Sequence, residues 1–237
     1  MGNDFFQFKQ FKVVQSRCAM KVTTDSCLFG AWVASISDHA ETILDIGAGT
    51  GLLGMMIAQK HTTKINAIEI EPTCFEQLKE NIENCKWSNN FNLHLGDIRE
   101  YEPSNQFDLI ISNPPFYENQ LSSENKGVNL AMHSNELNLE DLFQAVNNII
   151  DPNGSFYVLL PAFRQDECIK LAATCKLYPS QIMLVKQTTD HTFFRAMMKF
   201  SRDKNNDPTL TEISIKNKGN NYSDQFIELL AEYYLNF

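Results

Sequence analysis

The chain has 237 residues, of which 43% are hydrophobic and 21% are charged, as in ordinary globular proteins. Its net charge of −9 argues against indiscriminate binding to nucleic acid. No apolar run approaches the ~20 residues of a membrane span, and the start of the chain lacks signal-peptide features. We therefore expect one cytoplasmic domain over residues 1–237, with no membrane segment.

The cysteines predict neither a metal site nor a disulfide framework. None forms a Cys-x-x-Cys pair, and none lies near a histidine at the spacing of zinc ligands. We expect most of them to be core thiols in a reducing compartment. The six are Cys18, Cys27, Cys74, Cys85, Cys168 and Cys175.

Residues 1–40 form an N-terminal segment in which aromatic and basic residues alternate. The aromatics could form an RNA-facing strip, or a strand or strand pair that covers one edge of the core. Thr23 to Asp25 then give a helix N-cap signal, followed by an amphipathic stripe that includes Leu28 and Trp32. The phenylalanines are Phe5, Phe6, Phe8 and Phe11, and the basic residues are Lys9, Lys12, Arg17 and Lys21.

The catalytic core is predicted over residues 41–237, and it opens with a short apolar strand at 42–46 that contains Asp45. Gly47-Ala48-Gly49-Thr50-Gly51 follows, and then a helix at 52–60. Glycines allow a ligand to approach the backbone closely, and the amides at a helix N-terminus supply hydrogen-bond donors. The spacing Gly-x-Gly-x-Gly differs from the dinucleotide fingerprint, so the pattern indicates a cradle for another nucleotide-type cofactor.

Acidic residues end the next two predicted strands. Glu69 ends the strand at 64–69, about 20 residues beyond the glycines, where an acid typically binds ribose hydroxyls. Glu71 is the other candidate for this ribose contact, but it precedes Pro72, and this position is more typical of a helix cap. The strand at 91–95 ends in Gly96 and Asp97-Ile98.

A run of four residues, Asn113-Pro114-Pro115-Phe116, follows the buried strand predicted at 107–112. Two prolines fix φ and lack an N–H, so the backbone forms a stiff loop. The loop presents an amide side chain, a backbone carbonyl and a ring face. Two acceptors and one ring suit a flat substrate that carries an exocyclic NH₂ group.

The remaining pattern completes an α/β fold. We expect Rossmann-like doubly wound topology, with a mostly parallel seven-stranded sheet and an antiparallel C-terminal hairpin whose loop is Thr188–Thr192. Asp151 to Gly154 predict a turn, and Ser223 begins a final helix. The basic stretch at 199–218 could be an ordinary solvated surface or, beside a base-sized site, a source of phosphate contacts. The last three predicted strands cover 155–160, 181–187 and 193–200, and the basic residues are Lys199, Arg202, Lys204, Lys216 and Lys218.

Together with the three cofactor motifs, Asn113 to Phe116 resemble the S-adenosylmethionine-dependent methyltransferases that act on amino groups. Within these, the runs Phe6–Phe11, Arg17–Val22 and Asn221–Ser223 closely resemble the bacterial valine-tRNA adenine-N6 methyltransferases. The likeness spans nearly the whole chain. It implies that the N6 amine of the adenine 3′ of the anticodon in a valine tRNA is methylated.

The resemblance also implies roles for single residues. Asn113, Pro114 and Phe116 would be catalytic, and no metal would take part. A loop at 117–138 would grip the target. The cofactor contacts would be Lys21, Thr24, Asp45, Gly47, Gly49, Gly51, Glu69, Asp97, Ile98 and Asn113. The substrate contacts would be Lys9, Arg17, Pro115, Tyr117, Lys126 and His133.

Three alternatives remain open at the level of sequence. A glutamine-N5 methyltransferase of release factors would share the cofactor site, but it normally carries tyrosine at the position of Phe116. A guanine-N2 methyltransferase of ribosomal RNA can carry the same four residues, often on a longer chain. A cofactor-binding fold kept as an RNA-binding module would be non-enzymatic.

Overall fold

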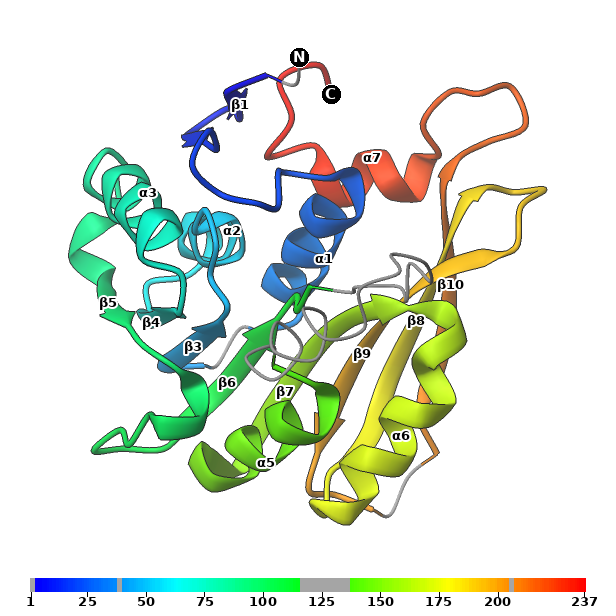
Figure 1. The fold of residues 1–237 in the computed structure, drawn as a ribbon. Coiled ribbons are helices and arrows are strands. Elements are labelled where there is room, and N and C mark those ends of the chain that lie inside the picture. Colours follow the sequence, from blue (N-terminus) through cyan, green and yellow to red (C-terminus); the bar gives the residue numbers. More distant parts are fainter. Residues whose placement is uncertain (1–2, 38–39, 116–136, 205–206) are drawn as a thin grey trace, which may run out of the picture.

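The computed structural model describes residues 3–37, 40–115, 137–204 and 207–237, and Figure 1 shows its ribbon. Within these ranges eight strands form one sheet, and β1 and β2 pair separately. The strands are β1 (Phe5–Gln7), β2 (Lys12–Val14), β3 (Thr42–Ile46), β4 (Lys64–Glu69), β5 (Phe91–Leu95), β6 (Phe107–Ser112), β7 (Ile150–Pro161), β8 (Tyr178–Thr188), β9 (Phe193–Ser201) and β10 (Thr209–Lys216). The α-helices are α1 (Thr24–Ser35), α2 (Leu52–Lys60), α3 (Pro72–Glu83), α5 (Leu139–Ile149), α6 (Gln165–Thr174) and α7 (Asp224–Leu230), and the short 3₁₀ turns are η1 (Ser88–Asn90), η2 (Ile98–Glu100) and η3 (Ala162–Arg164).

The sheet order is β10-β8-β9-β7-β6-β3-β4-β5. Only β9 runs against its neighbours among these described strands, pairing antiparallel with both β7 and β8. The predicted Rossmann-like α/β class and the antiparallel β8–β9 hairpin are therefore confirmed. The predicted count of seven strands is wrong, because β10 adds an eighth strand parallel to β8. Its residues belong to the basic stretch at 199–218, and no strand was expected for them.

Helices cover both faces of the sheet. Figure 1 shows α1, α2, α3 and α7 on one side and α5 and α6 on the other. Two buried clusters correspond to these layers: one contains Leu28, Met56 and Phe226, and the other contains Phe143 and Cys168. Strands β3 and β6 lie between the layers and are buried on both faces and mainly apolar, as expected of a parallel sheet covered by helices.

The chain reverses its direction of winding between β3 and β6. From β3 it builds outward through β4 to β5, and then it crosses back to place β6 on the other side of β3. In open α/β sheets, ligands bind beyond the carboxyl ends of the strands at such a switch point. The topology thus places the candidate site where the glycine loop and Asn113 follow their strands.

Capping residues set the helix boundaries much as the sequence indicated. Thr23 caps α1 in a reciprocal capping box with Ser26. Glu71 caps α3 by accepting from the backbone N–H groups of Thr73 and Cys74, with Pro72 as the first helical residue. Ser223 caps α7 by accepting from the Phe226 N–H, and the helix ends at Leu230. The preference for Glu71 as a cap is confirmed.

The N-terminal aromatics mainly cover the core. Phe8 and Phe11 are buried, and their rings stack with centroids 4.5 Å apart. Phe8 also packs near Tyr234 from the end of the chain. Of the two interpretations, the strand pair over a core edge is confirmed for these two rings, whereas Phe5 stays half exposed.

The predicted turn at Asp151–Gly154 is wrong. These residues lie within β7, where the register against β6 shifts: Phe107 pairs with Ile150, and Leu109 pairs with Ser155. The extra residues form an irregular bulge, and the Asp151 carboxylate accepts from the Asn153 N–H at 2.8 Å. Turn-forming residues here bend a strand without ending it.

Replacing Gly30 by leucine should destabilise the fold by about 1–3 kcal/mol, because overpacking a tight helix contact has costs of this order. A Cβ at Gly30 of α1 would lie 2.7 Å from the Met56 Sδ atom of α2. Urea denaturation of the variant would measure the loss. The control is Gly96→Leu, where a Cβ would meet nothing within 4 Å. Equal stability of the two variants would contradict the expectation.

Candidate active site

The carboxyl ends of β3 and β6 bring the glycine loop and Asn113 together. Ile46, the last residue of β3, is in register with Ser112, the last residue of β6. The buried Ser112 hydroxyl donates to the Ile46 carbonyl at 3.0 Å and fixes the two strand ends side by side. Neighbouring strands lie about 4.8 Å apart. Gly47 and Asn113 therefore leave the sheet at adjacent positions.

The glycine loop provides an open surface for a ligand. Gly47, Gly49 and Gly51 all have positive φ, a region that L-residues with side chains rarely adopt. A Cβ at Gly47 would meet nothing within 4 Å, and one at Gly49 would meet only the Gly47 carbonyl oxygen at 3.9 Å. The space above these two glycines is what a closely approaching cofactor requires. Gly51 differs, because it packs against Leu78 of α3.

Glu69 ends β4 and reaches the glycine loop. Its Oε2 atom accepts from the Gly49 N–H at 2.8 Å, and its Oε1 atom accepts from the Glu71 N–H at 2.9 Å. Each carboxylate oxygen keeps a further lone pair for a ligand hydroxyl. The carboxylate is thus held beside the open glycine surface.

Asp97 follows β5 on the same edge. Its carboxylate accepts from Arg99 Nε at 2.9 Å and from the Arg99 backbone N–H at 2.9 Å. The side-chain bond to Arg99 holds the pKa of Asp97 below its usual value. Ile98 is buried in the cluster that includes Phe143. The acid is therefore preorganised as an anion, although Arg99 shares its oxygens.

The described part of the Asn-Pro-Pro-Phe loop ends at Pro115. Asn113 is half-buried, Pro114 is buried and Pro115 is exposed. The buried Pro114 anchors the loop, so Asn113 lies at a fixed position directly after β6. Four predicted site residues, Phe116, Tyr117, Lys126 and His133, lie outside the described residues.

The N-terminal site residues have mixed surroundings. The Lys9 ammonium donates to the carbonyl oxygens of Ala231 and Phe237 at 2.6 and 2.8 Å, so it ties two ends of the described chain together. Arg17 forms an ion pair with Glu80 of α3. Lys21 is exposed, and Thr24 is half-buried in the first turn of α1.

The basic stretch at 199–218 divides between the two ends of the sheet. Arg202 lies just beyond β9, at the end of the sheet opposite the glycine loop, and donates to the Asn147 side chain and carbonyl oxygen. Lys199 of β9 lies over the Tyr157 ring, and burial lowers the pKa of its ammonium. Lys216 is instead the last residue of β10, and Lys218 follows it at the carboxyl end of that strand. The basic residues of this stretch are therefore not gathered at one end of the sheet.

Two cysteines depart from the expectation of core thiols. Cys18 and Cys74 form a disulfide across 56 residues of sequence. Of the other four, three are buried thiols and Cys175 is partly buried. Within the described residues, no group of three or more His, Cys, Asp or Glu side chains could hold a metal ion, and no helix is long and apolar enough to cross a membrane.

The family model of the methyltransferase small domain matches residues 28–164, which span α1 to η3. A tRNA1(Val) (adenine(37)-N6)-methyltransferase from Bacteroides fragilis is 37% identical over 99% of both chains. The chain belongs to this methyltransferase family. Relatives with the same description from Christiangramia forsetii and Flavobacterium johnsoniae are 34% and 36% identical, over 99% and 97% of this chain and 99% of theirs.

Solved structures of methyltransferases share the fold. A "predicted O-methyltransferase" from Agrobacterium tumefaciens aligns with a TM-score of 0.66 at 18% identity, over 90% of this chain and 99% of the other. A putative RNA methyltransferase from Pyrococcus horikoshii aligns with a TM-score of 0.58 at 16% identity, over 85% and 94% of the two chains. At these identities the likeness supports the family fold alone.

Asp45 of β3 is a buried carboxyl directly beneath the glycine loop of this methyltransferase. Its Oδ2 atom accepts from the Gly54 N–H at 3.3 Å, while Oδ1 has no partner among the described residues. Burial and, to a smaller extent, the nearby charge of Glu69 together raise the pKa of Asp45 to about 7, although the hydrogen bond from Gly54 opposes them. An acid in this position is sensitive to any positive charge placed on the loop.

Without cofactor, Asp45 should destabilise the protein increasingly as the pH rises. Its pKa lies near 3.8 in the unfolded chain and near 7 in the folded one, so between these values the folded state binds more protons. Stability from this group is therefore lost as the pH rises to about 7. Asp45→Asn should gain on the order of 2 kcal/mol over the wild type between pH 5 and pH 8. Urea denaturation at both pH values measures this, and a pH-independent difference would contradict it.

Proposed function

We propose that this chain transfers a methyl group from S-adenosylmethionine to the N6 amine of adenine 37 in a valine tRNA. The register between Ile46 and Ser112 carries the proposal, because it places the open glycine surface next to Asn113. The relatives that match nearly the full chain are described by this activity. The chain would act as one domain, in which residues 1–40 serve the substrate and residues 41–237 form the core.

The residues around the glycine loop fit the cofactor. Glu69 would accept hydrogen bonds from ribose hydroxyls, and Asp97 would accept from the adenine amine. The glycine backbone and the start of α2 would receive the polar tail, above the buried Asp45 carboxyl. When bound, S-adenosylmethionine supplies an electrophilic methyl group.

Asn113 would orient the target amine. The adenine N6 lone pair is delocalised into the ring, so the amine is a weak nucleophile. The Asn113 Oδ1 atom and the Pro114 carbonyl oxygen can each accept one of its two hydrogens. Holding both hydrogens favours a pyramidal nitrogen whose lone pair points at the methyl carbon. Catalysis is then chiefly positioning for in-line displacement.

The proton balance needs no strong base. Methyl transfer would form the N6–carbon bond as the sulfur–carbon bond breaks, and the departing sulfur would keep both electrons of that bond. The methylated amine is then positively charged and strongly acidic. It releases to solvent one of the two hydrogens that had been donated to Asn113 and Pro114.

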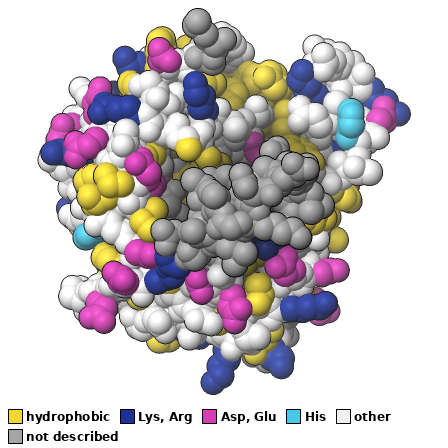
Figure 2. All heavy atoms as spheres, in the orientation of Figure 1, with side chains coloured by type: hydrophobic (Ala, Val, Ile, Leu, Met, Phe, Trp, Pro, Cys, Tyr) yellow, Lys and Arg dark blue, Asp and Glu magenta, His cyan; other side chains and the backbone are white. Residues whose placement is uncertain are grey.

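RNA recognition would rest on selected contacts. On the face shown in Figure 2, Lys and Arg side chains lie interspersed with Asp and Glu side chains and do not gather in one basic patch. This fits the net charge of −9 and favours specific over nonspecific binding. Lys21, which is exposed just before α1, is one candidate. A tRNA substrate would place the activity in the cytoplasm.

The test offers the purified protein S-adenosylmethionine with unmodified valine tRNA, a second tRNA, ribosomal RNA and a release factor, in separate reactions. Mass spectrometry of nucleosides and peptides locates the added methyl group. N6-methyladenosine at position 37 of the valine tRNA is the expected product. N2-methylguanosine in ribosomal RNA, or methylated glutamine in the release factor, would keep the cofactor proposal and overturn the substrate.

A further inference from the structure

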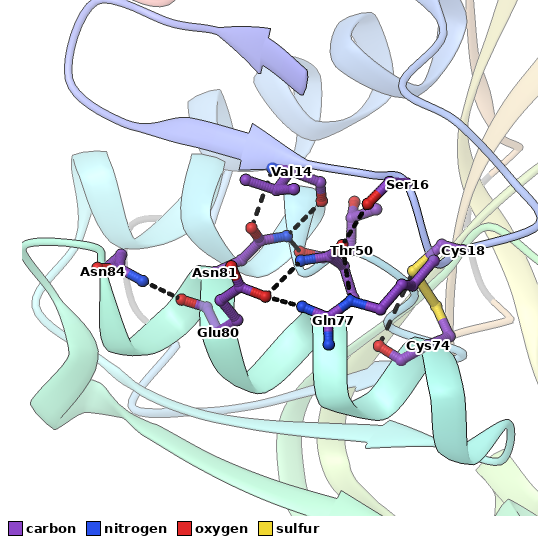
Figure 3. Close-up of polar contacts among 10 residues, drawn as sticks. Val14, Ser16, Cys18, Thr50, Cys74, Gln77, Glu80, Asn81 and Asn84 are labelled. Atoms are coloured by element: carbon purple, nitrogen blue, oxygen red, sulfur yellow. Dashed lines mark hydrogen bonds and ion pairs between the residues drawn. A yellow bond between two sulfur atoms is a disulfide. The ribbon is translucent and has the colours of Figure 1, made fainter. Parts of the chain in front are cut away.

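Helix α3 holds the N-terminal segment and the glycine loop at the same time. We call residues 14–18 the strap, which runs from the end of β2 toward α1. Figure 3 shows the strap lying along α3, with polar side chains of the helix pointing toward it. The contacts come from Cys74, Gln77 and Asn81, which are three or four residues apart and so share one helix face.

The strap and α3 run in opposite directions. Val14 contacts Asn81, Arg17 and Ser16 contact Gln77, and Cys18 is bonded to Cys74. Seven residues of helix rise about 10 Å, and four residues of extended chain span about 13 Å. The two lengths match well enough for the contacts to be made at regular intervals.

Asn81 is the link between the strap and the cofactor loop. Its Oδ1 atom accepts from the Val14 N–H at 2.9 Å, and its Nδ2 atom donates to the Val14 carbonyl at 2.8 Å. The same Nδ2 atom donates its second hydrogen to the Thr50 carbonyl at 2.9 Å. Thr50 lies between Gly49 and Gly51 of the cradle. Asn81 is only 2% exposed, so water cannot replace these bonds.

The neighbouring residues of α3 make the loop side of this contact rigid. A Cβ on Gly51 would lie 2.8 Å from Leu78 Cδ1 and 3.2 Å from Ile82 Cδ1, so the loop packs tightly on the helix. A displacement of the loop would thus be passed to Asn81 and from there to Val14. A buried amide whose three hydrogen-bonding groups are all used specifies one relative position of the two segments.

We propose that Asn81 positions the glycine loop for cofactor binding and couples this binding to ordering of the strap. The inference deepens the proposed function, since the strap contains Arg17, which is one of the expected substrate contacts. Such coupling is reciprocal. If the cofactor favours the ordered strap by a given factor, a ligand that binds the ordered strap raises cofactor affinity by the same factor.

The first test needs no variant and no RNA. Hydrogen–deuterium exchange of residues 14–18 is measured in the wild-type chain with and without S-adenosylhomocysteine. Bound S-adenosylhomocysteine should slow amide exchange in the strap by about tenfold, which is a typical coupling between two sites. Unchanged exchange in the strap, with binding confirmed by calorimetry, would overturn the proposal. A wrong tRNA assignment would leave this result standing.

The second test compares Asn81→Asp with Asn84→Asp. Aspartate keeps the acceptor for the Val14 N–H but places an oxygen against the Val14 and Thr50 carbonyl oxygens. Asn84 is the C-cap of the same helix, is exposed, and its side chain donates to the Glu80 carbonyl oxygen within the described part of the chain. Asn81→Asp should raise the Kd for S-adenosylhomocysteine about tenfold, whereas Asn84→Asp should leave it unchanged. Equal Kd values in the two variants would contradict the proposal.

Steady-state kinetics separates positioning from general loss of structure. Partial unfolding lowers the active fraction, and so it lowers kcat without raising KM for S-adenosylmethionine. A positioning defect raises KM about tenfold while kcat at saturating cofactor changes by less than about threefold. If Asn81→Asp does not fold, Asn81→Ala removes the donor without adding a repulsive oxygen. The same rises in Kd and KM are expected for it. A fall in kcat with unchanged KM would assign Asn81 a structural role only.

Discussion

Replacing Asn113 by alanine should lower kcat by about 10²–10³-fold, which is the usual cost of removing one preorganised group at a reacting centre. The Kd for S-adenosylmethionine should stay within about twofold, because the cradle is formed by other residues. The Asn113 amide makes no hydrogen bond to another described residue, so the fold does not depend on it. Single-turnover kinetics with saturating cofactor and tRNA measures the loss at the chemical step.

The control for Asn113→Ala is Asn113→Asp. Aspartate retains an acceptor oxygen for the target amine, so its kcat should fall less than that of the alanine variant. Both variants should unfold at the wild-type temperature. Turnover near the wild-type rate in Asn113→Ala would remove Asn113 from the mechanism. A matching loss of cofactor affinity would make it a binding residue instead.

Local patterns predicted the parts of the site that depend on local geometry. The glycine spacing indicated a cradle, and Gly47, Gly49 and Gly51 do adopt positive φ. Glu71 before Pro72 indicated a helix cap, which left Glu69 free to face the loop. Each of these features follows from a few neighbouring residues, so the sequence alone was sufficient.

Contacts between distant segments could not be predicted in this way. Cys18 and Cys74 lie in different elements, and nothing in their spacing pairs them. Asn81 looks like an ordinary polar residue of an amphipathic helix until the strap and Thr50 are placed beside it. Lys9 looked like a phosphate contact, yet it binds carbonyl oxygens near the end of the chain. Only tertiary structure reveals these partners.

Strand β10 was missed because its sequence carries a weak signal. It lies at the edge of the sheet, and the first four of its eight residues, Thr209 to Glu212, are exposed. Only Ile213 and Ile215 point into the core, so the period-two pattern covers a short stretch. Lys216 and Lys218 nearby favoured a surface interpretation. Edge strands are often polar, because an exposed apolar edge promotes aggregation.

Replacing Gly49 by valine should weaken binding of S-adenosylmethionine about 100-fold or more, a change of roughly 2.7 kcal/mol. The new side chain would enter the open space that the proposed cofactor occupies, since a Cβ there meets only the Gly47 carbonyl oxygen, at 3.9 Å. The positive φ of 57° adds backbone strain of about 1–2 kcal/mol. Cofactor affinity should therefore fall further than stability.

Gly51→Val is the matched control, because it changes the same residue type in the same loop with a positive φ of 82°. Its side chain would collide with Leu78 and Ile82 and not with a ligand, so the free energy of unfolding should fall more than for Gly49→Val. Calorimetry with S-adenosylhomocysteine and urea denaturation of both variants give the two quantities. If Gly49→Val bound the ligand as tightly as the wild type, the space above Gly47 and Gly49 could not be the cofactor site. A larger loss of affinity in Gly49→Val, with the larger loss of stability in Gly51→Val, would separate the ligand-facing side of the loop from the side that packs on α3.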